Sequence, residues 1–359
     1  MARVRRLPNG SACTGKLPRG CELCEKGAKL VLLVTGKCVR KCFYCPLSSA
    51  KRGKDVFFAN ERRVRGVAEV IDEAHLMDAL GTGVTGGDPF MAIDRTTRAI
   101  RALKREFGDG HHIHLYTASA DTGKVAAVAR AGLDELRFHP PLHLWQRLEG
   151  SEFARAADRS KELGMSTGLE IPAVPGRARE LAGAIRFASE HGLDFVNLNE
   201  LEFSETNWRR LRRLGFDVKG DVSSAVSGSE TLALSLLREG ADIALHYCSA
   251  SFKDGIQLRR RITRRARNVR KPHELLTDDG TFLKGVIETR TPARVIRLLL
   301  EEHGVPKELV HMDSDKGRVE VAPWVLEELA PELELESFIV EEYPTADRLE
   351  VERAPLTRR

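Results

Sequence analysis

Short apolar segments of β type alternate with amphipathic helical segments between residues 29 and 248. The β-type segments cover 29–35, 83–85, 112–117, 133–138, 166–171, 194–198 and 242–247. Strands that are separated by helices are expected to pair in parallel through right-handed crossovers. The alternation therefore predicts an α/β fold, and periodicity alone leaves open whether it is a barrel or a doubly wound sheet.

Polar residues stand before two of the early helical patterns and are predicted N-caps. Asn60 precedes a segment whose apolar face carries Val64, Val67 and Ile71, and Asp94 precedes the next helical segment. In either architecture, polar residues just past the strand ends are expected to line the active site.

The pattern changes beyond about residue 256, where a small α+β domain is predicted. Its expected elements are four strands and one helix, at 281–289, 318–321, 336–341, 348–351 and 292–302. We therefore expect three parts, which are a Cys-rich metal-binding segment (1–28), a barrel-type domain (29–255) and a C-terminal α+β domain that starts with a basic segment (256–359).

The composition favours a cytoplasmic protein. No apolar stretch approaches the ~20 residues that a membrane span needs, and the first residues lack the apolar core of a signal peptide. Six of the seven cysteines lie within the first 45 residues, which fits metal ligation in a reducing compartment better than a disulfide framework. Only two Gln and six Asn are present, a bias that predicts a thermophilic source.

Three cysteines lie on one short segment after the first predicted strand. Cys38, Cys42 and Cys45 have the spacing Cys-x3-Cys-x2-Cys. Three thiolates can hold three corners of a cuboidal iron-sulfur cluster, and the fourth iron then lacks a protein ligand. A zinc knuckle or a redox dithiol is the alternative, but structural zinc takes four ligands and a redox pair usually reads Cys-x2-Cys alone.

This spacing, with Tyr44 just before the third cysteine, resembles the signature of the radical S-adenosylmethionine (SAM) superfamily. The resemblance implies a 4Fe-4S cluster whose open iron chelates SAM, and reductive cleavage of SAM to a 5′-deoxyadenosyl radical. It also implies a partial, TIM-like (β/α)6 barrel and an electron donor of ferredoxin or flavodoxin type. The overall layout resembles an archaeal-type group related to pyruvate formate-lyase activating enzymes.

The same resemblance supplies candidate SAM-binding residues. Gly86, Gly87 and Asp88 resemble the Gly-Gly-Glu-Pro element that holds the amino group of SAM, with Asp in place of Glu. An ordinary turn is the alternative. Thr117, at the end of the third strand, and Glu170, in the fifth, are further candidates beside Tyr44; the alternatives are a plain strand end for Thr117 and an interior salt bridge for Glu170.

A second set of cysteines comprises Cys13, Cys21, Cys24 and, far away in sequence, Cys248. Four thiolates can close a metal site, either zinc or an auxiliary 4Fe-4S cluster. Buried, unreactive thiols are the alternative, mainly for Cys248. Wyosine-forming radical SAM enzymes of tRNA also carry an upstream cysteine triplet, although with a different spacing.

The net charge of +5 is unevenly distributed. Residues 301–350 contain fifteen acidic and four basic residues, so the other 309 residues carry +16. Residues 1–54 and 259–271 are strongly basic, and the second segment has eight cations and no acid. These segments suggest contact with tRNA or another RNA, while a solvated helix face or compensation of an anionic cluster is the alternative.

Three hypotheses of function result. The first is a radical SAM enzyme that modifies a substrate, which we suggest is RNA. The second is an activase of glycyl-radical enzymes, and the third is a non-catalytic, metal-stabilised RNA-binding protein. The sequence leaves the substrate, the catalytic residues and the identity of the second metal open.

Overall fold

The computed structural model describes residues 3–356, and Asp254 through its backbone only. The chain divides into two compact units. The barrel unit comprises Met1–His75 and Ala79–Leu258, and the C-terminal unit comprises Leu76–Asp78 and Arg259–Arg359. Within the described part of the chain, no helix combines the length and the apolar character that a bilayer crossing requires.

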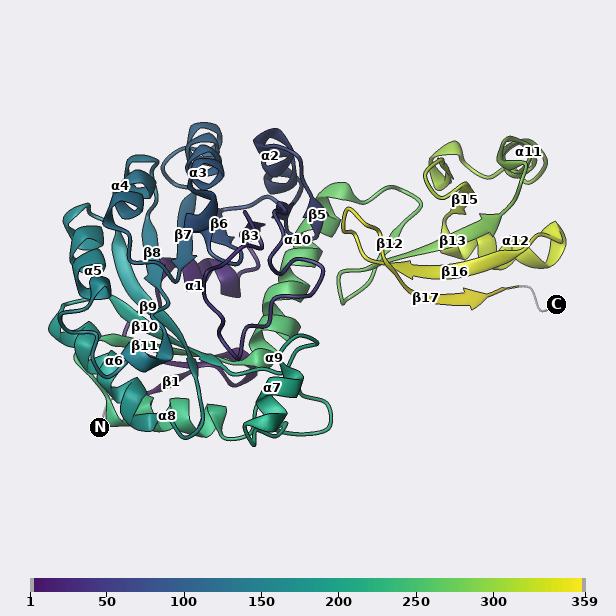
Figure 1. Cartoon of the computed structure of the whole chain (residues 1–359). Helices are drawn as coiled ribbons and strands as arrows, with labels where there is room; N and C mark the ends of the chain where they lie inside the picture. The colour runs from purple at the N-terminus through teal and green to yellow at the C-terminus, as the bar shows by residue number, and fades with distance from the viewer. Residues whose placement is uncertain (1–2, 357–359) are drawn as a thin grey trace. The chain divides into compact units, whose positions relative to one another are not determined.

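Seven parallel strands form the centre of the barrel unit (Figure 1). In spatial order they are β3 (Lys29–Leu33), β6 (Gly81–Thr85), β7 (His112–Thr117), β8 (Glu135–Phe138), β9 (Ser166–Ala173), β10 (Phe195–Glu200) and β11 (Ala244–Cys248). This order is also their order along the chain, so each crossover returns to the neighbouring strand. Consecutive right-handed crossovers put the helices on one face, and the sheet curls with its other face inward.

Six crossovers connect the seven strands, and their helices cover the outer face (Figure 1). The crossover helices are α2 (Val67–Leu76), α3 (Ile93–Phe107), α4 (Thr122–Arg130), α5 (Glu152–Glu162), α6 (Ala178–Glu190), α7 (Trp208–Arg213) and α8 (Ser229–Glu239). The predicted α/β fold with a TIM-like partial barrel is confirmed, and all seven strands had been marked by the hydrophobic pattern.

Short antiparallel strands extend the sheet at both edges. β2 (Ala12–Thr14) pairs with β11, and β1 (Arg5–Arg6) pairs with β2. At the other edge, β4 (Phe58–Ala59) pairs with β3, and β5 (Arg62–Arg63) pairs with β4. Among residues 3–356 no ladder joins β1 to β5, so the barrel is open.

A short helix, α1 (Arg19–Glu25), lies inside the curve of the sheet (Figure 1). The backbone N–H of Gly20 donates to Glu135 Oε2 at 3.2 Å, and Lys29 Nζ donates to the Gly20 carbonyl at 3.0 Å. Gly81 leaves room for this helix, because a Cβ there would lie 2.8 Å from Leu23 Cδ1. Lys29 and Glu135 are the first residues of β3 and β8, so α1 closes the end of the barrel where the strands begin.

The two predicted N-caps are wrong. Asn60 has φ 52° in the turn between β4 and β5, where its side chain accepts a hydrogen bond from Val31 N at 3.0 Å. Asn tolerates this left-handed conformation, and the helix starts later, at Val67. Asp94 lies within the first turn of α3, which begins at Ile93.

The C-terminal unit is built on an antiparallel sheet. Its strand order is β14 (Val310–Asp313), β15 (Arg318–Val321), β13 (Phe282–Glu288), β16 (Ser337–Glu342) and β17 (Glu350–Pro355), with β12 (Leu275–Leu276) beside β13. Its helices are α10 (Arg259–Val269), α11 (Pro292–Arg297) and α12 (Pro323–Leu333), while α9 (Ala250–Phe252) belongs to the barrel unit. The four predicted strands are present, whereas β14 and α12 had not been predicted.

The two faces of this sheet differ in chemistry. Ile287, Val319 and Val321 belong to an apolar core. This core also includes Leu299, which follows α11, and Leu326 of α12. Strand residues alternate between faces, so Lys284 and Glu320 project to the opposite side. The C-terminal unit therefore has an apolar core on one face of the sheet and buried ions on the other.

The buried ions are centred on Lys284, which is 1% exposed. Its Nζ lies 2.7 Å from Glu274 Oε1, 3.2 Å from Glu342 Oε1 and 3.5 Å from Glu320 Oε1. Burial alone would raise the pKa of Glu342, but Lys284 and neighbouring cations, including Lys316, lower that pKa to about 2. Each carboxylate therefore depends on its cation, because an unpaired buried charge is strongly destabilising.

We expect Lys284→Met to destabilise the C-terminal unit by about 3–5 kcal/mol at pH 7, because three buried carboxylates then lose a shared counter-charge. A carboxylate with a depressed pKa stabilises the fold above its ordinary pKa of 4.5 and loses that contribution as the pH falls toward about 2. The difference from the wild type should therefore shrink between pH 4.5 and pH 2. Differential scanning calorimetry of the full chain measures it.

Lys316→Met is the matched control. Its Nζ lies 2.7 Å from Glu342 Oε2, but its side chain is 29% exposed. Partly solvated pairs contribute about 1 kcal/mol or less, so this variant should lose far less stability. Equal losses in the two variants would contradict the central role of Lys284.

Candidate active site at the cysteine loop

The cysteine loop, residues 36–53, follows β3 and is closed at its base by backbone hydrogen bonds. Gly53 N donates to Gly36 O at 2.7 Å, and Gly36 N donates to Lys54 O at 2.9 Å. The loop is thereby held as a compact unit at the end of a buried strand. Strand ends of this kind are where parallel α/β proteins place their active sites.

The three thiols of this loop are free and near enough to interact electrostatically. Cys38 is exposed, Cys42 and Cys45 are partly buried, and Arg40 N donates to Cys38 Sγ at 3.3 Å. Burial raises the pKa of the Cys38 thiol; the Arg40 hydrogen bond lowers it, and the nearby Asp88 carboxylate raises it further. The structure thus brings the predicted cluster ligands together with Asp88.

Gly86 and Gly87 lie directly against the backbone of this loop. Gly87 N donates to Thr35 O at 2.7 Å. A Cβ at Gly86 would lie 2.3 Å from Thr35 O, and a Cβ at Gly87 would lie 2.3 Å from Lys37 O. Backbone atoms cannot give way as the end of a side chain can, so both positions require glycine. The two glycines therefore let the turn after β6 seat the cysteine loop.

Asp88 follows these glycines and carries one unpaired oxygen. Its backbone N–H donates to Lys37 O at 2.8 Å, and its Oδ1 accepts from Phe90 N at 3.0 Å and from Thr117 Oγ1 at 2.8 Å. Within the described residues, the buried Oδ2 has no hydrogen-bond partner. Burial raises the pKa of this carboxyl. Asp88 and Thr117, which the sequence suggested separately, thus form one unit with an open acceptor.

The Tyr44 side chain contacts His139, which directly follows β8. Its hydroxyl lies 2.9 Å from His139 Nε2, and His139 Nδ1 lies 2.6 Å from the Glu170 carbonyl. Burial lowers the pKa of His139, so the ring is neutral at pH 7. A carbonyl can only accept, so Nδ1 carries the proton and Nε2 accepts from the Tyr44 hydroxyl. This chain of hydrogen bonds anchors the cysteine loop to β8 and β9.

The Glu170 carboxylate faces the barrel interior, where other residues of the chain bind it. It accepts from Arg137 Nη1 at 2.9 Å, Asn197 Nδ2 at 2.7 Å and Asn199 Nδ2 at 2.6 Å. Burial would raise its pKa, but Arg137 and the two amides outweigh that effect and lower it. The Glu170 carboxylate therefore forms an interior salt bridge with Arg137. This is the alternative that the sequence offered to direct binding of SAM.

Arg137 is the main interior residue that the sequence did not single out. It is 1% exposed, and its Nε donates to Glu135 Oε1 at 2.6 Å while its Nη2 donates to Cys21 Sγ at 3.4 Å. Its charged end lies between the rings of Tyr116 and Phe195. The only signal was a pair of charged residues, Glu135 and Arg137, within a short strand.

The second cysteine set lies in the barrel interior. Cys21 and Cys24 are on α1, Cys13 is on β2, and Cys248 ends β11. Cys13 and Cys21 belong to the same small buried cluster. The structure therefore brings thiols from β2, α1 and β11 to one region of the barrel interior.

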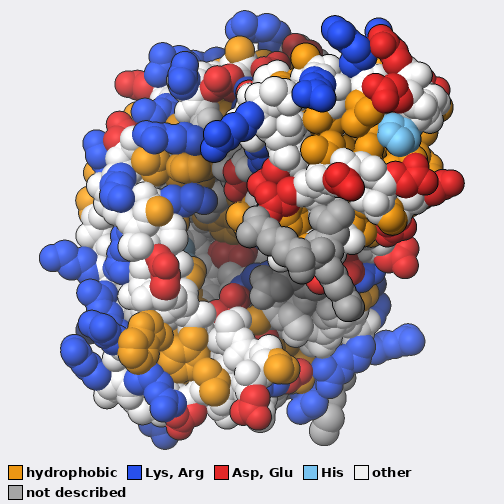
Figure 2. Space-filling model, turned by 90° about the vertical axis from the view of Figure 1, so that its right-hand side faces the viewer, with side chains coloured by type: hydrophobic (Ala, Val, Ile, Leu, Met, Phe, Trp, Pro, Cys, Tyr) orange, Lys and Arg blue, Asp and Glu red, His pale blue; other side chains and the backbone are white. Residues whose placement is uncertain are grey.

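The basic segment 259–271 finds partners within the C-terminal unit. Arg264 Nη2 lies 2.6 Å from Asp78 Oδ2, Arg259 contacts Asp279 at 3.5 Å, and Arg265 is buried. The missing acidic partners are thus supplied by other segments. In Figure 2, Lys and Arg side chains are spread over much of the outline of the face shown, and Asp and Glu side chains lie among them.

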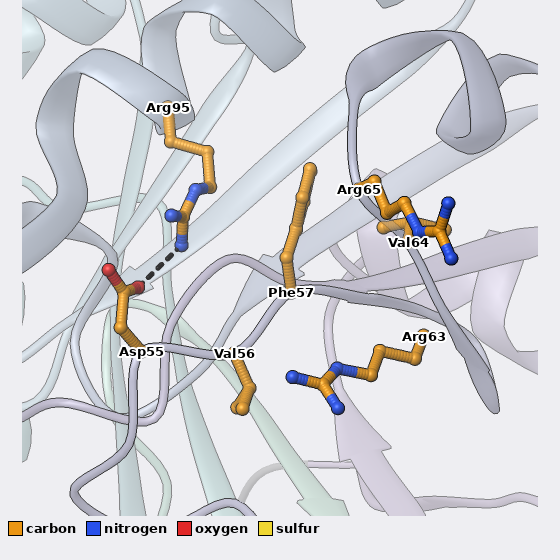
Figure 3. Close-up of a pocket in the computed structure, with 7 residues that line it drawn as sticks. All are labelled: Asp55, Val56, Phe57, Arg63, Val64, Arg65 and Arg95. Carbon is orange, nitrogen blue, oxygen red and sulfur yellow. Dashed lines mark hydrogen bonds and ion pairs between the residues drawn. The ribbon is translucent and has the colours of Figure 1, made fainter.

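A surface pocket lies beside the base of the cysteine loop (Figure 3). It is lined by Asp55, Val56, Phe57, Arg63, Val64, Arg65 and Arg95. Asp55 and Arg95 point toward one another, and their Oδ1 and Nη1 atoms are 2.7 Å apart. Arg95 Nη1 also donates to Val34 O at 2.7 Å. None of the predicted site residues lines this pocket, so we do not assign the reaction to it. Instead, Arg95 connects Val34 and Asp55, which lie on the two sides of the cysteine loop.

We expect Gly87→Ala to disturb the cysteine loop, because the new Cβ would collide with the Lys37 carbonyl. The collision would displace the loop from the conformation that binds iron. If this displacement costs roughly 1.4 kcal/mol or more, the variant should bind at least about tenfold less iron at the loop after anaerobic reconstitution. Gly110→Ala is the control, because a Cβ there meets nothing within 4 Å. Equal iron content in both variants would contradict the steric argument.

Solved structures that resemble part of this chain include two proteins. SuiB of Streptococcus suis matches with 14% identity and a TM-score of 0.41, over 62% of this chain and 49% of that chain. The protein anSMEcpe with bound AdoMet matches with 15% identity and a TM-score of 0.35, over 50% of this chain and 52% of that chain. The matched region spans about half the length of each of these structures.

Two family models and one relative match this sequence. A model of the radical SAM superfamily matches residues 32–141, and a model described as a domain of unknown function, DUF8061, matches residues 280–356. A protein of Methanocaldococcus jannaschii, named as a candidate glycyl-radical enzyme activating enzyme, is 40% identical over 95% of this chain and 93% of that protein. The chain is therefore a member of the radical SAM superfamily.

Proposed function

We propose that this radical SAM enzyme is an activase, which abstracts a hydrogen atom from a glycine of a partner polypeptide. The observation that carries the proposal is the 40% identity, over nearly the full length of both chains, to the Methanocaldococcus jannaschii protein that bears this name. The similarity includes the C-terminal unit, so it extends beyond the catalytic core that radical SAM enzymes of many specificities share.

The residues of the site fit the cofactors of the superfamily. Cys38, Cys42 and Cys45 would hold a 4Fe-4S cluster, since they are free thiols on one closed loop. The unpaired, buried Oδ2 of Asp88 fits the amino group of SAM, which needs an acceptor. When bound, the cluster and SAM supply a 5′-deoxyadenosyl radical after transfer of one electron from a ferredoxin or flavodoxin type of donor.

The remaining site residues of this chain hold the loop in place. Gly87 permits the close contact with the Lys37 carbonyl, and Thr117 fixes the Asp88 carboxylate through Oδ1, which leaves Oδ2 directed elsewhere. The Tyr44 hydroxyl is held by His139. A preorganised acceptor costs little reorganisation when a cationic group binds, which favours affinity.

The proposed transfer takes place in two steps and uses one electron from the donor. One electron from the donor cleaves the bond between sulfur and C5′ of SAM, which yields methionine and the radical. The radical then forms a C5′–H bond as the glycine Cα–H bond of the partner breaks. The products are 5′-deoxyadenosine and a glycyl radical, and no further oxidant is needed.

RNA modification has less support. Its argument was two basic segments, 1–54 and 259–271. In the second, the structure supplies partners for Arg259 and Arg264 and buries Arg265. A non-catalytic RNA-binding protein would also provide no ligand for the buried, unpaired Oδ2 of Asp88. The similarity to the Methanocaldococcus jannaschii protein therefore favours the activase over RNA modification.

Asp88→Asn should weaken SAM binding while the loop keeps its iron. Asn retains the Oδ1 acceptor for Phe90 N and Thr117, but it replaces the open oxygen by an N–H donor that faces the ammonium group. Loss of a charge-assisted hydrogen bond of about 1.5–3 kcal/mol predicts a Kd for SAM that rises about 10- to 100-fold. Equilibrium dialysis with the reconstituted protein measures it, and Asp94→Asn, at an exposed position of α3, is the control. An unchanged Kd would refute this role.

Isotope transfer tests the proposed substrate. Reconstituted wild-type protein, SAM and dithionite are incubated with host-cell protein labelled with [2,2-²H]glycine, or with RNA from cells grown in deuterated medium. We expect deuterium in 5′-deoxyadenosine from the labelled protein only, and no 5′-deoxyadenosine from Cys42→Ala. Val39→Ala, an exposed change in the same loop, should retain activity. Deuterium transfer from RNA alone would replace the activase by RNA modification.

A further inference from the structure

We propose that Cys13, Cys21, Cys24 and Cys248 hold a second metal centre, a four-iron cluster enclosed by the barrel. This site is distinct from the cysteine loop, which uses the other three cysteines of the chain. It also does not depend on the identity of the substrate.

Two of the four thiols come from paired strands. Cys13 of β2 lies opposite His246 of β11, and His246 lies opposite Asn197 of β10, which lies opposite Glu170 of β9. Directly paired residues project from the same face of a sheet, and alternation puts Cys248 on that face too. Since the side chains of Glu170 and Asn197 meet Arg137 and Cys21, this is the inner face.

The other two thiols come from the helix inside the barrel. Cys21 and Cys24 are three residues apart on α1, so they lie on the same side of the helix. Arg137 Nη2 and Asn197 Nδ2 each lie 3.4 Å from Cys21 Sγ, and Lys29 Nζ lies 3.5 Å from Cys24 Sγ. Both sulfurs therefore face the strands.

The two pairs converge. Cys13 and Cys21 pack in one buried cluster with Leu17. Cys248 lies close enough to Cys21 and Cys24 to interact with both electrostatically. Four of the seven cysteines, separated by up to 235 positions along the chain, are thus gathered in one enclosed region, where a metal centre would be shielded from solvent.

Polar side chains direct hydrogen-bond donors at two of the four sulfurs. Three N–H donors, from Arg137, Asn197 and Lys29, are directed at sulfur atoms, and two of these donors are cations. A neutral thiol is a weak acceptor, whereas hydrogen bonds to the sulfurs are a standard means of stabilising and tuning an iron-sulfur centre. Buried inert cysteines would pack against apolar side chains without such donors.

The four thiols are not gathered as a single zinc ion would gather them. Tetrahedral zinc with Zn–S bonds of about 2.3 Å holds its thiolates roughly 3.8 Å apart. In the described residues, the one group of three ligand atoms within 4.8 Å of one another is His273, Glu274 and Glu320, and both carboxylates of this group pair with Lys284. No three of the four thiols are that close, and the same is true of Cys38, Cys42 and Cys45. A cubane binds its thiolates at separate corners, so it does not require them to approach one another that closely.

The test uses a full-length variant that lacks the first cluster. In Cys38→Ala/Cys42→Ala/Cys45→Ala, reconstituted anaerobically, we expect about four irons and four sulfides per chain, against about eight of each in the wild type. Adding Cys21→Ser or Cys24→Ala should remove this remaining iron and its electron paramagnetic resonance signal after reduction. Thr14→Ser, beside Cys13, is the matched control and should retain it.

Several outcomes would overturn the proposal. They are absence of iron from the triple variant, stoichiometric zinc in place of iron, and iron that persists in both added variants. Circular dichroism melting curves show whether each chain is folded, and two separate cysteine changes prevent one misfolded variant from deciding the result. Because the readout is metal content, failure here leaves the activase proposal intact, and failure of hydrogen transfer from glycine leaves this centre intact.

Discussion

The buried guanidinium of Arg137 is the interaction on which the barrel interior depends. A fully buried cation is tolerated only with compensating charges and hydrogen bonds, and Glu135 and Glu170 provide them. Glu135 lies on β8 beside Arg137 and accepts from Gly20 N of α1, while Glu170 lies on β9. The arginine thus connects the helix inside the barrel to both strands. Cys21 and the Glu170 carboxylate are therefore positioned by the same group.

The site at the cysteine loop depends on a different constraint, which is steric. Gly86 and Gly87 allow two backbones to meet at distances that any Cβ would prevent. That contact fixes Asp88 beneath the loop, and Thr117 then fixes which carboxylate oxygen stays open. Rigid elements thus supply both the loop and the acceptor, which is the arrangement that a precise cofactor site requires.

The sequence predicted the features that are local. The alternation of β and helical segments located all seven parallel strands, and the cysteine spacing identified the loop, because both are patterns within short windows. It did not predict α1 inside the barrel or the roles of Arg137 and Lys284, since each depends on partners far away in sequence. Asn60 failed for the same reason, because Val31 and the β4–β5 turn, not a helix, determine its conformation.

Charge counting along the chain suggested an RNA partner, but it did not reveal which charges are paired within the fold. The net charge of −11 in residues 301–350 includes Asp313, Glu320 and Glu342, which lie inside the C-terminal unit and pair with buried or partly buried cations. The basic segment is likewise paired, through Arg264 with Asp78. Long-range attraction depends on charges that face solvent, so charges neutralised within the fold contribute little to steering a polyanion. The same pairing explains why an acidic domain and a basic helix can occur in one chain without implying a nucleic-acid partner.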